Sequence, residues 1–227
     1  MPHDDKSRRI SDRPFERAEF GLPGHGFVFC CFNHAYKLNP AVFASRMKLL
    51  KAVAGSVLWL SKNNNETAAN NLRREAVAAG VNPTRLVFAD RLPSSADHLA
   101  RHRLADLFPD NLPYNAHTTA SDALWAGLPV LTQIGGTFAG RVAASLLAAV
   151  GLPELIAETP EQFESLAVEL ATKPDLLAAI KAKLAQNRLT EPLFNMPLYT
   201  RHLEGAYRAM VQRFRQGLLP EHIQVPQ

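Results

Sequence analysis

The chain has 227 residues, and 25 basic residues against 21 acidic ones give it a formal charge of +4 at pH 7. Hydrophobic residues make up 47% of the chain and charged residues 20%, which is typical of a globular domain and argues against disorder. No apolar run approaches about 18 residues, and the first residues are polar. We therefore expect no membrane-spanning segment, no secretory signal and no membrane partner.

The two cysteines, Cys30 and Cys31, are adjacent. Neighbouring residues on a strand point to opposite faces, so this pair is not expected to form a disulfide or to bind a metal. A cytoplasmic protein in a reducing compartment fits this cysteine usage best.

The basic residues occur as scattered pairs, which favours solvated helix faces or an anionic ligand such as a nucleotide. A nucleic-acid partner is not expected, because the sequence has neither a basic stripe nor aromatic residues interleaved with basic ones. The sequence pI of about 9.2 is the one feature that keeps nucleic-acid binding as an alternative.

In chain order, a polar and charged segment comes first and is predicted to be a tail or linker, residues 1–20. Short apolar runs then alternate with segments of helical periodicity and capping signals. Strands are predicted at 26–33, 56–61, 85–90, 104–108, 128–133 and 154–158. Helices are predicted at 41–54, 66–79, 95–103, 119–126, 138–150, 160–172, 174–187 and 196–216.

This alternation predicts an α/β fold in which a doubly wound, Rossmann-like parallel sheet is covered by helices on both faces. We expect one such domain over residues 21–195. The last predicted helix is amphipathic, so residues 196–227 are predicted to pack on the same domain as a C-terminal helix and tail.

Ligands of open parallel sheets bind at the carboxyl ends of the strands, so polar residues there are candidates for a site. Lys37 follows the first predicted strand and is placed to reach a phosphate, although an ordinary surface lysine is an alternative. His98 and Arg101 follow the third strand and lie three residues apart, hence on one helix face. They are candidates for contacts to a base or a ribose, or they belong to a capped surface helix.

The segment after the fourth strand places Thr118 and Thr119 at the mouth of a helix. Free N–H groups and the positive helix end favour an anion at such a place. Thr119 and Asp122 also have the spacing of a capping box with Asp in place of Glu, and capping and ligand binding are compatible.

Several common nucleotide and metal motifs are missing. The sequence has no G-x-G-x-x-G after the first strand, no Walker lysine motif and no Asp-x-Asp pair. His117 has no His or Glu at ligand spacing, so a zinc site is not expected. We therefore predict no metal.

Five blocks of sequence carry a resemblance to a known family, and the run NAHTTASDALWAG is the most specific of them. The blocks span residues 32–40, 56–60, 98–106, 115–127 and 141–145. Together they resemble the carboxyl-terminal catalytic half of protein O-GlcNAc transferases and their SPINDLY-like relatives. The resemblance extends from about residue 10 to residue 220.

This resemblance implies the carboxyl-terminal, nucleotide-sugar-binding domain of a GT-B glycosyltransferase. The implied reaction is inverting, metal-independent transfer of N-acetylglucosamine from UDP-GlcNAc to Ser or Thr of a protein acceptor, without a cofactor. Full members add tetratricopeptide repeats and an amino-terminal catalytic domain, so a separate amino-terminal half is a possible partner. GDP-fucose is an alternative donor, and a non-catalytic nucleotide-sugar-binding module or a truncated remnant is an alternative function.

The resemblance also implies roles for individual residues. Lys37 matches the lysine that contacts the donor diphosphate and offsets charge on the departing UDP, which would make it catalytic. His34 neighbours the donor phosphates. The other implied contacts are to the uracil (His98 and Arg101), to the pyrophosphate (His117, Thr118 and Thr119) and to the ribose (Asp122).

Overall fold

A computed structural model describes residues 8–62 and 65–225. Its six strands are short and all pair in parallel. The first three form one ladder: β1 (Val28–Cys31), β2 (Val57–Ser61) and β3 (Leu86–Ala89). The other three form a second ladder: β4 (Phe108–Pro109), β5 (Val130–Gln133) and β6 (Ile156–Ala157).

The two ladders meet at Leu107, immediately before β4. Leu107 forms a parallel bridge with Phe29, and its carbonyl accepts the Cys30 N–H at 2.9 Å. The spatial order is therefore β3-β2-β1-β4-β5-β6, the doubly wound arrangement that the alternating pattern predicts. Its strand order reverses between β1 and β4, so a crevice for a ligand is expected at their carboxyl ends.

The predicted fourth strand at 104–108 is wrong in its position. Residues Arg101–Leu104 form a 3-10 helix, and the strand covers Phe108–Pro109. Asp106 holds the segment before β4 next to β1, because its carboxylate accepts the Val28 N–H at 2.9 Å. This tertiary contact has no signature in the local apolar pattern.

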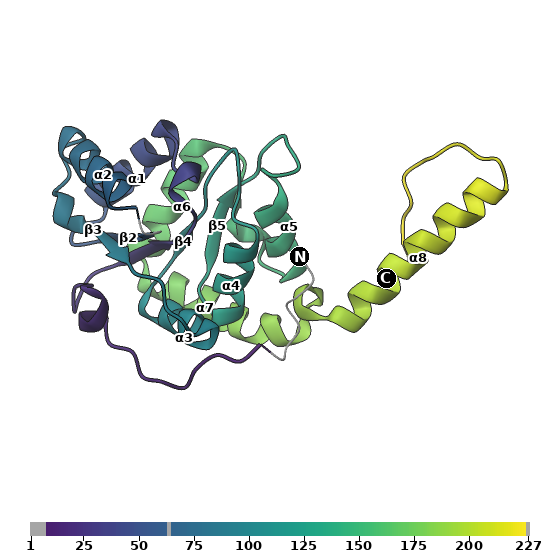
Figure 1. Cartoon of the computed structure of the whole chain (residues 1–227), viewed down its shortest axis with the longest axis horizontal. Coiled ribbons are helices and arrows are strands. Elements are labelled where there is room, and N and C mark those ends of the chain that lie inside the picture. The colour runs from purple at the N-terminus through teal and green to yellow at the C-terminus, as the bar shows by residue number, and fades with distance from the viewer. Residues whose placement is uncertain (1–7, 63–64, 226–227) are drawn as a thin grey trace.

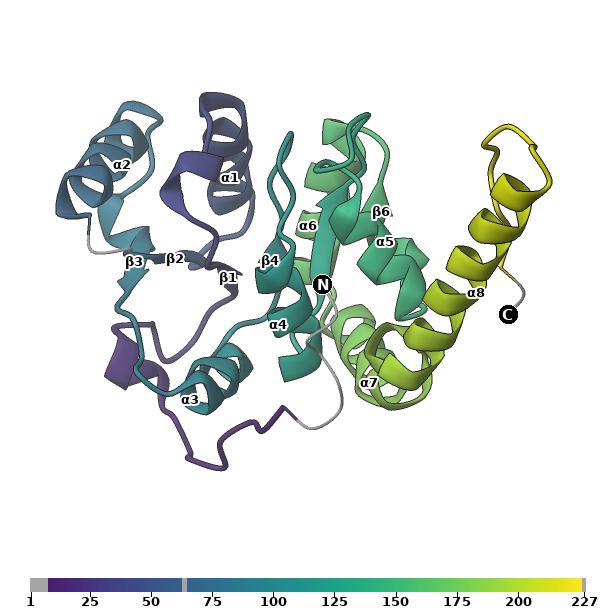
Figure 2. The same cartoon turned by 45° about the vertical axis from the view of Figure 1, so that its right-hand side comes forward.

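Eight α-helices occupy the described part of the chain. Their bounds are α1 (Pro40–Ala52), α2 (Glu66–Ala78), α3 (Ser95–Ala100), α4 (Thr118–Ala126), α5 (Val142–Ala149), α6 (Pro160–Thr172), α7 (Pro174–Thr190) and α8 (Met196–Arg215). Contacts join α1 to α6, and they join α4 to both α3 and α5, so the sheet lies between two helical layers (Figure 2). None of the helices in this part of the chain is both long and apolar enough to cross a membrane.

The core is built from strand residues that are buried on both faces of the sheet. Trp59, Phe29 and Phe108 are among its largest fully buried side chains. Cys30 and Cys31 are also buried and free, as their adjacency predicts. Burial raises the pKa of the Cys31 thiol to about 11, which disfavours its thiolate form.

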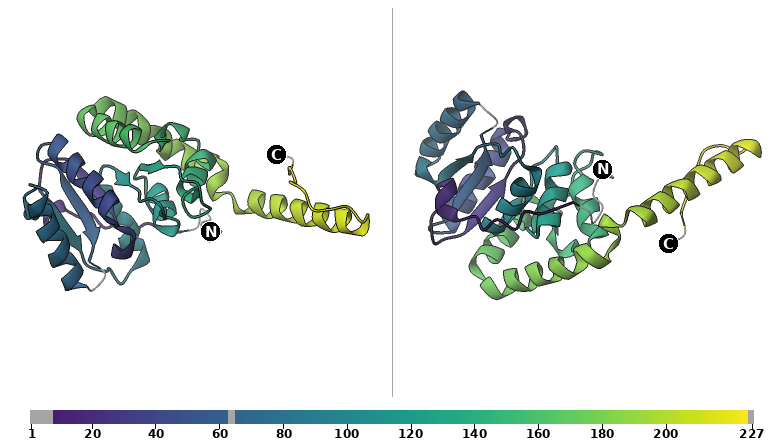
Figure 3. Two further views of the ribbon diagram at one scale, coloured as in Figure 1. Left: turned by 90° about the horizontal axis from the view of Figure 1, so that it is seen from above. Right: turned by 60° about the horizontal axis from the view of Figure 1, so that its bottom comes forward.

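The two terminal segments differ from their predictions. The described residues of the predicted tail run along the domain: the Ser11 N–H donates to the Ala96 carbonyl at 3.1 Å, and Phe20 packs against the core. At the other end, only the first turns of α8 reach the domain, where Met196 and Tyr199 line a pocket together with residues of α5. The rest of α8 extends away from the domain and buries no residue (Figures 1 and 3).

Candidate functional site

The predicted site residues gather around the crevice between β1 and β4. The segment after β1 carries Asn33 and Lys37, and the segment after β4 leads into the N-terminus of α4. The two segments are joined directly, because the Thr119 hydroxyl donates to Asn33 Oδ1 at 2.6 Å.

Lys37 contacts the loop that leads into the N-terminus of α4. Its Nζ donates to the Asn115 carbonyl at 2.8 Å and lies 4.0 Å from the centre of the Tyr114 ring. That ring stacks on His117, with 5.0 Å between ring centroids. We call Lys37, Tyr114, Asn115 and His117 the Lys37 cluster. Burial lowers the pKa of the half-buried Lys37, against the charges of Asp110 and Cys31, which raise it.

The predicted capping box at the start of α4 is wrong. His117 occupies the N-cap position, and no side chain of the described residues caps the helix. The Thr119 hydroxyl is turned toward Asn33, and Asp122 is paired with Arg8 at 2.8 Å. Both side chains are drawn away from the helix end by partners distant in the sequence. Within residues 8–62 and 65–225, no side chain therefore caps the first turn of α4, and free backbone N–H groups at a helix N-terminus favour an anion.

A second cluster lies at the ends of β1 and β3. Arg101 is only 3% exposed, and its guanidinium carbon lies 4.3 Å from the centre of the Phe32 ring. Its Nη1 donates to the Asp90 carbonyl at 2.7 Å, and its Nη2 donates to His98 Nδ1 at 2.7 Å. We call Phe32, His98 and Arg101 the Arg101 cluster. Ser94 caps α3, the helix that carries His98.

The protonation state of His98 follows from this geometry. Burial and then the positive charge of Arg101 lower the pKa of His98 to about 4, so the ring is neutral near pH 7. Arginine has no acceptor, so the nitrogen that faces Arg101 carries no proton. The proton is therefore on Nε2, which is a hydrogen-bond donor.

His34 lies between Phe32 of the Arg101 cluster and Lys37 in the sequence. His34 is exposed and stacks on Tyr36. It lines a pocket of about 460 Å³ together with His98 and Arg101. The structure therefore brings three of the predicted residues into one pocket, while Lys37, His117 and Thr119 surround the start of α4.

Sequence reasoning missed several polar residues of this region. His102 is 1% exposed and packs edge-on against Phe32, and burial lowers the pKa of His102 to about 3. Asn33 Nδ2 and Asn115 Oδ1 are buried, and neither has a hydrogen-bond partner among the described residues. Buried polar groups without partners are rare and are typical of functional regions. Asn33 lies shortly after β1, and Asn115 lies shortly before α4. These positions are the one sequence feature that could have identified them.

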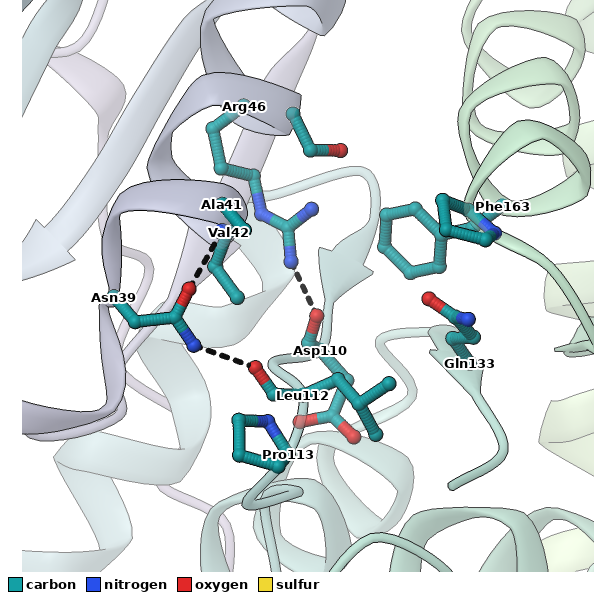
Figure 4. Close-up of a pocket in the computed structure, with 11 residues that line it drawn as sticks. Asn39, Ala41, Val42, Arg46, Asp110, Leu112, Pro113, Gln133 and Phe163 are labelled. Carbon is teal, nitrogen blue, oxygen red and sulfur yellow. Dashed lines mark hydrogen bonds between the residues drawn. The ribbon is translucent and has the colours of Figure 1, made fainter. Parts of the chain in front are cut away.

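A separate pocket of about 320 Å³ lies between α1 and α6 (Figure 4). Arg46 points into it, and its Nη2 donates to the Asp110 carbonyl. Asn39 donates from Nδ2 to the Leu112 carbonyl at 2.8 Å. Burial raises the pKa of Asp110 to about 6, while hydrogen bonds from the Ala116 N–H and Thr132 lower it. None of the predicted site residues is among the described residues that line this pocket. Its polar side chains, Arg46 and Asn39, bind the loop that carries the Lys37 cluster residues Tyr114, Asn115 and His117.

Metal ligands are not grouped in the described ranges 8–62 and 65–225. No three His, Cys, Asp or Glu side chains come together there as a potential metal site.

Comparison with known proteins identifies the family. The profile described as Glycosyl transferase family 41 matches residues 13–203. A Caenorhabditis elegans protein named UDP-N-acetylglucosamine--peptide N-acetylglucosaminyltransferase is 36% identical over 207 residues, which is 91% of this chain and 18% of the relative. An Arabidopsis thaliana protein, named as a probable enzyme of the same kind (SEC), is 37% identical over 92% of this chain and 21% of its own length.

Solved structures agree with the sequence comparison. The Thermobaculum terrenum O-GlcNAc transferase mutant K341M superposes with a TM-score of 0.81 at 30% identity, over 92% of this chain and 39% of that one. WaaG, a glycosyltransferase involved in lipopolysaccharide biosynthesis, has a TM-score of 0.56 at 17% identity and shares the fold. The chain spans about a fifth of the length of the Caenorhabditis elegans and Arabidopsis thaliana relatives.

Proposed function

The chain belongs to glycosyl transferase family 41, and we propose that it is the donor-binding half of a protein O-linked N-acetylglucosaminyltransferase. It binds UDP-GlcNAc for inverting, metal-independent transfer of the sugar to Ser or Thr of a protein acceptor. One observation carries this proposal: the Lys37 ammonium lies beside the N-terminus of α4, which has no side-chain cap among the described residues.

The Lys37 cluster and the first turn of α4 bind the donor diphosphate. The helix end supplies N–H groups and a partial positive charge, and Lys37 adds a full charge. Negative charge grows on the diphosphate as the bond to the sugar breaks. A fixed cation at that point lowers the barrier by stabilising the leaving group. Thr118, Thr119 and His117 are the further polar groups at this helix end.

The Arg101 cluster binds the uracil. His98 is neutral and presents its Nε2–H, which suits a carbonyl oxygen of the base. Arg101 holds the other ring nitrogen, so the orientation of the imidazole is fixed before a ligand arrives. Asp122, on α4, accepts hydrogen bonds from the ribose hydroxyl groups.

A general base for the acceptor hydroxyl and an acceptor-binding surface come from an amino-terminal half. Closure of the two halves then aligns the reacting atoms. Two alternatives share this site: a nucleotide-sugar-binding module without catalysis, and a remnant of a longer enzyme. GDP-fucose is the alternative donor.

Calorimetric titration of the 227-residue chain with UDP, UDP-GlcNAc and GDP-fucose tests the proposal. Saturable binding of the two uridine ligands is expected, with a loss of about tenfold or more in Lys37→Ala because a charge-assisted contact to phosphate is removed. Lys51→Ala is the matched control, since Lys51 is exposed on α1. Absence of uridine binding would refute a working donor site. Preference for GDP-fucose would replace the donor, and absence of sugar transfer when an amino-terminal half is supplied as well would favour the module.

A further inference from the structure

Arg8 lies at the ribose carboxylate of the proposed site. Its Nη2 donates to Asp122 Oδ1 at 2.8 Å, and the two side chains are only 20% and 12% exposed. A charge-assisted hydrogen bond with little solvent around it is stronger than a surface ion pair. The contact joins residues 114 positions apart, so it depends on the path of the N-terminal segment.

The segment around Arg8 is held in place by independent contacts. Trp125 donates its indole N–H to the Arg8 carbonyl at 2.9 Å. Trp125 and Asp122 are three residues apart on α4, so one helix face binds both the backbone and the side chain of Arg8. Further along, Arg103 Nη1 donates to the Ser11 carbonyl at 3.0 Å. Figure 1 shows this purple segment running past α3 toward α4.

Arg8 acts on both residues that the proposal assigns to the nucleoside, His98 and Asp122. Its positive charge contributes to lowering the pKa of His98, after burial and Arg101. The hydrogen bonds of Ser11 to Ala96 and of Arg8 to Asp122 place the segment against α3 and α4, the helices that carry His98 and Asp122.

We infer that Arg8 is a positioning residue of the donor site, which orients Asp122 for the ribose, and that residues 8–11 form part of that site. This inference rests on the proposed function, since it assigns the ribose to Asp122. The inference concerns contacts to the uridine part of the ligand and does not involve the contacts to its phosphates.

The test titrates the full chain with UDP and, separately, with inorganic pyrophosphate. Arg8→Ala is expected to weaken UDP about tenfold, because Asp122 loses its orienting partner, while pyrophosphate affinity changes less than about twofold. Arg8→Lys keeps the charge without the planar fork and is expected to retain part of the affinity. Arg9→Ala is the matched control, because it removes the same charge from an exposed neighbour.

A double-mutant cycle with Asp122→Asn distinguishes positioning from general destabilisation. Arg8→Ala is expected to have no further effect on UDP affinity in the Asp122→Asn background. Additive losses, or equal losses for UDP and pyrophosphate, would overturn the inference. Tighter binding of UDP by Arg8→Ala would also overturn it, because the segment would then compete with the ligand.

Failure of the inference and failure of the proposed function have different signatures. If the unmodified chain binds UDP and Arg8→Ala binds it equally well, only the role of Arg8 is wrong. If the unmodified chain does not bind UDP, the donor site and the role of Arg8 are both wrong. Thermal unfolding of each variant confirms that it is folded, and Arg8→Lys provides the comparison if Arg8→Ala does not fold.

Discussion

The two ends of the proposed site differ in how far the protein itself satisfies their polar groups. Arg101 is buried, donates to a backbone carbonyl and to His98, and lies against an aromatic ring. Lys37 is half-buried, and it contacts the Asn115 carbonyl and the face of the Tyr114 ring. The nucleoside end is thus part of the folded core, whereas the diphosphate end has a cation that can exchange a carbonyl for a phosphate. Substitutions at the first end should cost stability, and substitutions at the second should cost affinity.

Arg101→Ala is expected to have the largest effect on stability, about 3 kcal/mol in urea unfolding. It removes a buried group and leaves the Asp90 carbonyl and His98 without a donor. Arg74→Ala, at an exposed position of α2, is the control and should change stability by less than about 0.5 kcal/mol. Similar values for the two variants would show that the nucleoside end is not part of the core.

The pH dependence of stability should follow His102. Burial, and then the charges of His98 and Arg101, lower the pKa of His102 to about 3 in the folded protein. The unfolded chain, with a pKa of about 6.5, takes up the proton first as the pH falls. The stabilisation is therefore complete above pH 6.5 and is lost on acidification toward pH 3. Between pH 7 and pH 5 this amounts to about 2 kcal/mol.

His102→Gln tests this assignment by unfolding at both pH values. The variant should be less stable at pH 7 and should lose about 2 kcal/mol less than the unmodified chain on acidification to pH 5. His98, whose pKa is lowered to about 4, contributes with the same sign as His102, and Asp110, whose pKa is raised to about 6, contributes with the opposite sign. Both contributions are common to the two proteins and cancel in the difference. His25→Gln, at an exposed position, is the control. Parallel curves for His102→Gln and the unmodified chain would contradict the assignment.

At the diphosphate end, Lys37→Ala should change the free energy of unfolding by less than about 1 kcal/mol, despite its loss of UDP affinity. The side chain is half-buried and makes one hydrogen bond, to a carbonyl. Urea unfolding of the same samples used for titration separates the two effects. A loss comparable to that of Arg101→Ala would abolish the difference between the ends.

Tyr114→Ala should have the smallest effect, a loss of about twofold to fivefold in UDP affinity. The ring lies 4.0 Å from Lys37 Nζ, and a partly exposed cation–π contact contributes about 0.5–1 kcal/mol to the position of the cation. Tyr207→Ala on α8 is the control, since that ring is exposed and distant in the fold. An unchanged affinity in Tyr114→Ala would show that Lys37 is positioned by the Asn115 carbonyl alone.

The alternation of strands and helices and most helix bounds could be predicted from local sequence patterns alone. Apolar runs identify β1, β2 and β5, because strands buried on both faces admit few polar residues. Gly127 ends α4 with a φ of 90°, which the sequence signals because glycine adopts this conformation without strain. The resemblance of residues 115–127 identified the family, which the comparison confirms.

The partners of the polar side chains, in contrast, depend on the three-dimensional fold. Thr119 and Asp122 have capping spacing, yet Asn33 and Arg8 draw them away from the helix end. Asp106 moves the fourth strand by the same kind of long-range contact. Local patterns record the preferences of neighbouring residues, whereas hydrogen bonds between distant segments depend on where the sheet order brings those segments together. For that reason the sequence could predict candidate residues for the site, whereas the fold determines which neighbours hold their side chains.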